Sequence, residues 1–319
     1  MSGLANRRYQ TLALSGGGYR GLFTAKFIAS CEQEFQAKCA DRFDLIAGTS
    51  IGALLAAGLA ASVPATTLAS IMEDYGPTIF RRNIFTGAKR FLFAAPYDPE
   101  PILEAVRTAL GKNTAKLPLN QFDAPLVITA VNYSTGQTRV FRSKGIAGRS
   151  ASDVKIEDAI LASAAAPTFF PTRKIGPSEY IDGGLAANAP DMVAICDALE
   201  HGKTRLDEIY QLSIGTASRR EGAAVHDTSS GPGALSWIVF RGLVQSIMAA
   251  QEHLALSQAS TLLRDRLLRV DQEPAQNQVK AIKSLDLATK SATSTLSLLA
   301  DSAWDEHGNS RSLRDFFVH

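Results

Sequence analysis

The chain has 319 residues, of which 45% are hydrophobic and 20% charged, and this composition is that of a folded protein and not of a disordered one. Its 33 basic and 31 acidic residues leave a net charge of +2, which gives no global field for DNA or RNA, so any basic site must be local. Three scattered cysteines and an N-terminus without an apolar segment favour a reducing, cytoplasmic compartment and no secretory signal.

Alternating strands and helices are predicted over the first sixty residues. Residues 9–15 form a short apolar strand candidate, and after a glycine cluster residues 22–35 have helical periodicity. Residues 43–47 predict a second buried strand, residues 48–52 a turn, and residues 53–61 a helix of small residues. This order is typical of a parallel sheet flanked by helices.

Residues 76–100 interrupt this order, because they contain several prolines and show no clean period. Aromatic and basic side chains together suit an anionic bilayer surface, which makes the segment a candidate mobile cover or membrane contact. The alternative is an excursion packed on the core with a solvated basic face. The side chains concerned are Phe80, Phe85, Phe91, Phe93, Tyr97, Arg81, Arg82, Lys89 and Arg90.

Beyond this segment the chain returns to alternating elements. The predicted strands are residues 126–131, 138–141, 179–181 and 209–214, and the predicted helices are residues 100–110 and 156–166. A Gly/Ser-rich loop over 218–233 precedes a mainly helical part with one candidate strand at 267–270. We expect a single domain over 1–319, with its motifs within 9–216 and a helical C-terminal part at about 234–319.

Gly48-Thr49-Ser50-Ile51-Gly52 has the G-x-S-x-G pattern of a nucleophile elbow and lies between a predicted strand and a predicted helix. A sharp turn there exposes the serine hydroxyl, and the flanking glycines remove side chains that would clash. A glycine-rich turn whose serine only caps the helix is the alternative. The strand and the helix on either side favour Ser50 as a nucleophile.

Three glycines, Gly16, Gly17 and Gly18, follow the first strand. With Gly21 they also fit the dinucleotide-binding pattern of an oxidoreductase, but that site needs an acidic residue at the end of the second strand, where this chain has Ala47. Successive glycines can instead direct backbone N–H groups at one point, as an oxyanion hole requires. A tight turn without a ligand is the remaining alternative.

Asp182 follows a short strand and precedes two glycines, so its carboxylate can face the same crevice as Ser50. A partly buried carboxylate can accept the serine proton directly. An ordinary Asp-Gly turn is the bland alternative. A triad of Ser50 and Asp182 with His226 or His253 is possible, but no histidine follows a convincing strand.

Four ordered motifs together resemble the patatin-like phospholipase family over about residues 9–216. They are GGGYRG at 16–21, GTSIG at 48–52, ASAAAPTFFP at 162–171 and DGGLAANAP at 182–190, and LSIGT at 212–216 is also similar to the family. The resemblance implies a three-layer α/β/α fold with a mainly parallel central sheet.

The resemblance also implies roles for individual residues. It makes Ser50 and Asp182 a catalytic dyad that works without a histidine, and it places the oxyanion hole at Gly16, Gly17 and Gly18. Arg20 matches the arginine that supports that loop. No cofactor is implied, and no cluster of residues has convincing metal-ligand spacing.

The implied activity is hydrolysis of membrane phospholipid esters through an acyl-enzyme, on the inner face of the membrane. In size and layout the chain is similar to the phospholipase effectors of cyclic-nucleotide anti-phage signalling systems (CBASS), which implies a cyclic di- or trinucleotide activator. Its phosphates and bases would need basic and aromatic partners, available at 76–100 or after Gly233, where Trp237 and Arg241 lie. A homo-oligomer is compatible with this expectation. The alternatives are a constitutive housekeeping lipase and a non-catalytic binding protein on the same fold.

Overall fold

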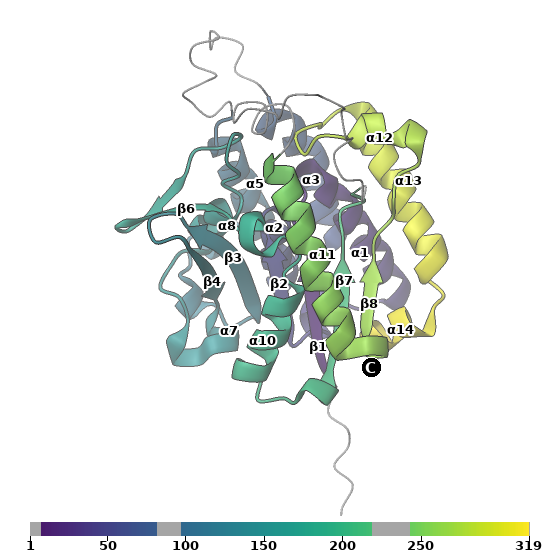
Figure 1. Ribbon diagram of the computed structural model, residues 1–319, viewed down its shortest axis with the longest axis horizontal. Coiled ribbons are helices and arrows are strands. Elements are labelled where there is room, and N and C mark those ends of the chain that lie inside the picture. Colours follow the sequence, from purple (N-terminus) through teal and green to yellow (C-terminus); the bar gives the residue numbers. More distant parts are fainter. Residues whose placement is uncertain (1–7, 82–96, 219–242, 319) are drawn as a thin grey trace, which may run out of the picture.

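The computed structural model describes residues 8–81, 97–218 and 243–318. Within these ranges eight strands form one sheet in the order β5-β6-β3-β2-β1-β7-β8, with β4 also paired to β3 (Figure 1). The strands are β1 (Tyr9–Leu14), β2 (Leu45–Thr49), β3 (Leu126–Asn132), β4 (Gln137–Arg142), β5 (Arg173–Ile175), β6 (Ser178–Asp182), β7 (Ile209–Ile214) and β8 (Leu267–Val270). Every strand predicted from the sequence is present, and β5 is an addition.

Helices surround this sheet. Those of the first half are α1 (Gly21–Phe35), α2 (Ile51–Ala60), α3 (Ala65–Ile79), α5 (Glu100–Leu110), α6 (Lys112–Ala115), α7 (Lys144–Ala147) and α8 (Ile156–Ser163). The later ones are α9 (Gly184–Ala187), α10 (Asp191–His201), α11 (Leu243–Leu263), α12 (Gln276–Ile282), α13 (Lys290–His307) and α14 (Arg311–Val318). In the described ranges no helix combines the length and the apolar character needed to cross a bilayer.

The sheet separates two apolar layers because alternate side chains of each strand point to opposite faces. In β2, Ile46 belongs to the larger core, which contains side chains of α1, α2, α3 and α13. Its neighbours Leu45 and Ala47 belong to the second core, which is closed by α10 and α11 (Figure 1). The expected three-layer α/β/α architecture is confirmed.

The centre of the sheet is parallel, as expected. β1 pairs in parallel with β2 on one side and β7 on the other, and β2 pairs in parallel with β3. β8 adds a further parallel strand beside β7, so the C-terminal part shares the same sheet. α14 secures the end of the chain, because Phe317 stacks on Phe35 and Phe316 stacks on Phe43.

One end of the sheet is antiparallel, and this arrangement positions the site. β4 pairs along the whole of β3 from Val127 to Asn132. β2 pairs with β3 as far as Thr129, whereas β6 pairs antiparallel with β3 from Ala130 onward. β4 therefore occupies one edge of β3. The strands β2 and β6 must share the other edge of β3, where they end against each other.

The segment at 76–100 departs from expectation at its start. Helix α3 continues to Ile79 with Pro77 in its last turn, so the irregular part begins later than predicted. Tyr97 is buried and packs against Phe80, Phe169 and Phe170. The other residues proposed as a cover or membrane contact, except Arg81, lie at 82–96, outside the described residues, as do Trp237 and Arg241.

Candidate active site

Ser50 connects β2 to α2 in a conformation that L-residues rarely adopt. Its φ of 56° and ψ of −123° place it outside the helical and extended regions. The flanking glycines are required by packing: a Cβ on Gly48 would lie 2.1 Å from Gly52 O, and one on Gly52 would lie 2.3 Å from Leu14 O. The expected elbow is therefore built by two backbone contacts that leave no room for a methyl group.

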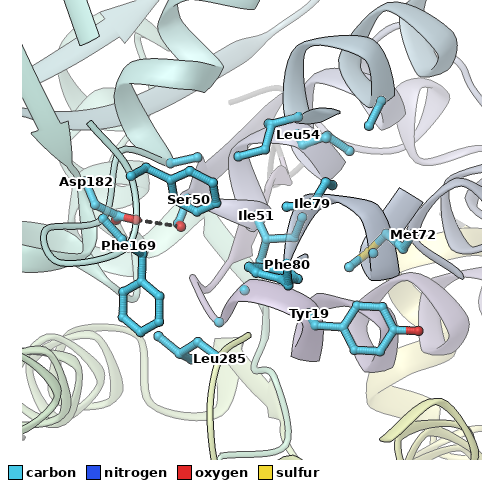
Figure 2. Close-up of a pocket in the computed structure, with 18 of the residues that line it drawn as sticks. Tyr19, Ser50, Ile51, Leu54, Met72, Ile79, Phe80, Phe169, Asp182 and Leu285 are labelled. Atoms are coloured by element: carbon cyan, nitrogen blue, oxygen red, sulfur yellow. Dashed lines mark hydrogen bonds between the residues drawn. The ribbon is translucent and has the colours of Figure 1, made fainter. Parts of the chain in front are cut away.

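The Ser50 hydroxyl is directed at Asp182. Ser50 Oγ donates to Asp182 Oδ2 over 2.7 Å (Figure 2). Gly184 N donates to Asp182 Oδ1 over 2.7 Å. Gly183 has to be small, because a Cβ there would lie 2.3 Å from Thr129 O. The structure thus joins the two residues that the sequence singled out.

The register of β3 explains how residues 132 positions apart meet. Thr49 is opposite Thr129, and Asp182 is opposite Ala130, the next residue along the same strand. The two threonine hydroxyls share a 2.6 Å hydrogen bond, and Thr49 Oγ1 also donates to Ala187 O over 2.6 Å. These buried contacts tie the elbow to the segment that follows Asp182.

Burial raises the pKa of Asp182 from 3.8 to about 6, and the hydrogen bonds from Gly184 and Ser50 oppose this effect. The side chain is only 2% exposed, so desolvation of the charged form is the dominant cause. A carboxyl with this pKa is mostly ionised at neutral pH and remains a better proton acceptor than an ordinary aspartate. It is suited to accept the Ser50 proton.

The glycine loop has N–H groups that are already engaged and, within the described part of the chain, others that are free. Gly16 N donates to Asn188 O over 2.9 Å, and Tyr19 N donates to Leu285 O over 2.9 Å, so these two N–H groups are engaged. For Gly17 and Gly18 no such bond occurs among the described residues. Gly18 has a φ of +57°, and a Cβ on it would lie 2.3 Å from Leu285 O. Of the three glycines expected to form an oxyanion hole, Gly17 and Gly18 keep donors available.

Arg20 ends the short 3-10 turn Gly18–Arg20 that continues this loop, and it is half-buried. Burial lowers the pKa of its guanidinium, and the carboxylates of Glu252 and Asp271 oppose that shift. Its Nε has no hydrogen-bond partner in the described part of the chain. The position is compatible with the supporting role implied by the family resemblance.

Among the described residues no histidine hydrogen-bonds Ser50 or Asp182. His253 is exposed on α11, and His201 and His307 lie beside glutamates on α10 and α13, while His226 and His319 fall outside the described residues. Asp197, Glu200 and His201 are the one set of described side chains with metal-ligand proximity, and Arg142 already binds the Asp197 carboxylate. Neither the three described histidines nor this set hydrogen-bonds Ser50.

An apolar cavity extends from Ser50 and Asp182 into the molecule (Figure 2). Its walls are aliphatic and aromatic side chains from α2, α3, α5 and α8 and from the turns beside the glycine loop. They include Ile51, Leu54, Ile71, Met72, Ile79, Phe80, Ile102, Ile160, Phe169, Phe170 and Leu285. An apolar lining of this kind suits a hydrocarbon group, and the Ser50 hydroxyl and the Asp182 carboxylate form its polar end.

Several residues of the site were not singled out from the sequence. Ser163 Oγ accepts from Ser50 N over 2.8 Å and so holds the elbow, and the ASAAAP motif was the available signal. Met248 and Leu285 line the cavity from the C-terminal part, where no motif marks them.

Known proteins are similar to this chain over most of its length. The family model described as "Patatin-like phospholipase" matches residues 12–195. A "cGAMP-activated phospholipase" of Pseudomonas aeruginosa is 33% identical over 295 residues, covering 90% of this chain and 85% of that protein. One of the same name from Escherichia coli is 30% identical, covering 100% and 95%. Among solved structures, VipD from Legionella pneumophila matches with a TM-score of 0.39 at 13% identity, covering 93% and 67%.

The raised pKa of Asp182 predicts a pH-dependent difference in stability between the wild type and Asp182→Asn. The folded-state pKa exceeds the unfolded value, so the proton binds the folded state more tightly and stability falls as pH rises through about 6. From pH 8 to pH 5 the wild type should gain about 1.4 kcal/mol of unfolding free energy relative to the variant. Urea unfolding at both pH values measures this, and parallel pH curves would contradict it.

Proposed function

The chain belongs to the patatin-like phospholipase family, and from that membership we propose that it cleaves phospholipid esters of membranes with Ser50 as nucleophile and Asp182 as general base. That it is a lipid ester hydrolase follows from the family and from the relatives named as phospholipases. The observation that carries the finer assignment is the 2.7 Å hydrogen bond from Ser50 Oγ to Asp182 Oδ2 at the end of an apolar cavity.

The reaction begins with proton transfer from Ser50 Oγ to Asp182 as the oxygen attacks the ester carbonyl carbon. The carbonyl oxygen of the tetrahedral intermediate accepts hydrogen bonds from Gly17 N and Gly18 N, while Gly16 shapes the loop. The intermediate collapses to an acyl-Ser50, and Asp182 returns the proton to the departing alkoxide. A water molecule activated by the same carboxylate then releases the fatty acid.

The cavity supports a long acyl chain as the substrate feature that is recognised. The walls beyond the dyad are aliphatic and aromatic, and the dyad is the polar end. Each methylene transferred from water to such surroundings contributes about 0.8 kcal/mol to binding. The enzyme would withdraw this chain from the inner face of the membrane, which it contacts as a peripheral protein.

Regulation by a cyclic nucleotide is supported by relatives that cover nearly the whole chain and are named for cGAMP activation. We propose that a cyclic di- or trinucleotide shifts this enzyme toward its active state in anti-phage defence, where membrane damage ends the infected cell. Such a ligand activates only if it binds the active conformation more tightly than the resting one.

Ser50→Ala should abolish hydrolysis of a phospholipid and leave the fold intact, because it removes one half-buried hydroxyl. Asp182→Asn should be nearly as inactive, since an amide cannot take the proton. Losses of at least 10²-fold in kcat/KM are expected for both. A fluorophosphonate probe should label the wild type but not Ser50→Ala, and more than about a tenth of the activity remaining in either variant would contradict the assignment.

The pH profile provides an independent check on the base. Asp182 must be ionised to act, so kcat/KM should rise about tenfold per pH unit below pH 6 and level off above it. Initial rates with a short-chain ester between pH 5 and pH 8 measure this. A flat profile over that range would exclude Asp182 as the titrating base.

Activation is tested by an ester hydrolysis assay with purified protein across a panel of cyclic oligonucleotides that includes cGAMP. At least one should raise the wild-type rate tenfold or more, and Ser50→Ala should stay inactive with every one. Full activity without nucleotide, unchanged by the whole panel, would favour the constitutive lipase and leave the dyad assignment standing.

A further inference from the structure

An ion pair from the C-terminal third, largely shielded from solvent, lies against the glycine loop, although no motif marks it and the family match ends at residue 195. Arg269 on β8 and Glu252 on α11 form it, with Arg269 Nη2 3.0 Å from Glu252 Oε1. Their side chains are only 14% and 15% exposed. A buried pair of this kind adds little net stability over apolar packing, so its presence needs another explanation.

Arg269 also binds the start of the glycine loop. Its Nη1 donates to Ser15 Oγ over 3.0 Å and to Ser213 Oγ over 2.9 Å, and its Nη2 also binds Asp271 Oδ2 over 3.0 Å. Ser15 directly precedes Gly16. The guanidinium therefore fixes the residue from which the loop begins.

Glu252 extends the contact toward Asp182. Its second oxygen accepts from Asn188 Nδ2 over 2.7 Å. The neighbouring Gln251 accepts from Asn188 N over 2.9 Å and donates to Ala186 O. Asn188 Oδ1 has no partner among the described residues, so the carboxylate of Glu252 orients the amide.

Asn188 lies between the two halves of the active site. Its backbone oxygen accepts from Gly16 N over 2.9 Å. Its Oδ1 would lie 2.5 Å from a Cβ on Gly16 and 2.9 Å from one on Gly184, so the amide packs against both glycines. Gly184 is the residue whose N–H holds the Asp182 carboxylate. The position of Asn188 therefore sets the spacing between the glycine loop and the base.

We infer that Glu252 and Arg269 are positioning residues for the reaction: acting through Asn188 and Ser15, they hold the glycine loop at its working distance from Ser50 and Asp182. The inference rests on the proposed dyad. It assigns the C-terminal part a role in kcat, because a misplaced oxyanion donor weakens the transition state more than the bound substrate. Neither Glu252 nor Arg269 lines the acyl cavity, whose apolar walls come mainly from other elements, so KM should change little.

Glu252→Gln is the main test, because it keeps the shape of the side chain and removes its charge. Arg269→Met is the second variant. The matched control is Asp197→Asn, which breaks the buried Arg142–Asp197 pair on β4 and α10, where Arg142 is opposite Val127 and so toward the other end of β3. Thermal stability, kcat and KM for a short-chain ester and the rate of fluorophosphonate labelling are measured for each.

Glu252→Gln should lower kcat and the labelling rate at least tenfold and change KM by less than threefold, with a loss of thermal stability no greater than that of Asp197→Asn. Asp197→Asn should keep kcat within twofold of the wild type. The inference is overturned if Glu252→Gln keeps kcat within twofold of the wild type. It is also overturned if Glu252→Gln and Asp197→Asn lose kcat in the same proportion to their loss of thermal stability. Arg269→Met should match Glu252→Gln if it folds, and failure to fold leaves the decision with Glu252→Gln.

The proposed function can fail separately in this experiment. If Ser50→Ala hydrolyses the ester like the wild type, the dyad assignment is wrong and the inference falls with it. If Ser50→Ala is inactive while Glu252→Gln is fully active, only the positioning role is lost.

Discussion

Two strands that run in opposite directions end against each other on one edge of β3, and the site depends on that junction. β2 ends opposite Thr129 and β6 ends opposite Ala130, so the residue after β2 and the last residue of β6 meet at hydrogen-bonding distance. A shift of one residue in either register would turn the side chains to the other face of the sheet. The threonine pair behind the junction and the glycines that exclude any Cβ make such a shift costly.

The junction places the carboxylate of Asp182, a residue that is only 2% exposed, away from bulk solvent. Burial that raises the pKa of Asp182 to about 6 works against stability at neutral pH, and the same burial makes the group a competent base. Ser50 adds backbone strain with its positive φ. Other contacts must hold both residues in these unfavourable states, and the glycine loop, Ser163 and Asn188 provide such contacts.

The sequence predicted the strands, the elbow and Asp182 because each has a local signal: apolar runs, glycines at fixed positions and ordered motifs. It did not predict that β6 is antiparallel, because the same apolar pattern is compatible with either direction. The role of Asn188 also had no local signal, since it depends on the side-chain shape between Gly16 and Gly184. In the sequence, nothing distinguishes Glu252 and Arg269 from charged residues on a solvated helix or strand face. In the fold their side chains are only 15% and 14% exposed. Pro77 misled the prediction because a proline in the last turn of a helix need not end it.

The hydrogen bond from Tyr19 N to Leu285 O has a consequence for synthesis of the protein. The glycine loop is made early, but its partners Asn188, Arg269 and Leu285 are made late, and β1 acquires its neighbour β7 only after two hundred residues. Contacts of such long sequence separation form slowly and only once both partners exist. A nascent chain still on the ribosome therefore holds Ser50 without the assembled loop, and the site is complete only after translation has passed residue 285.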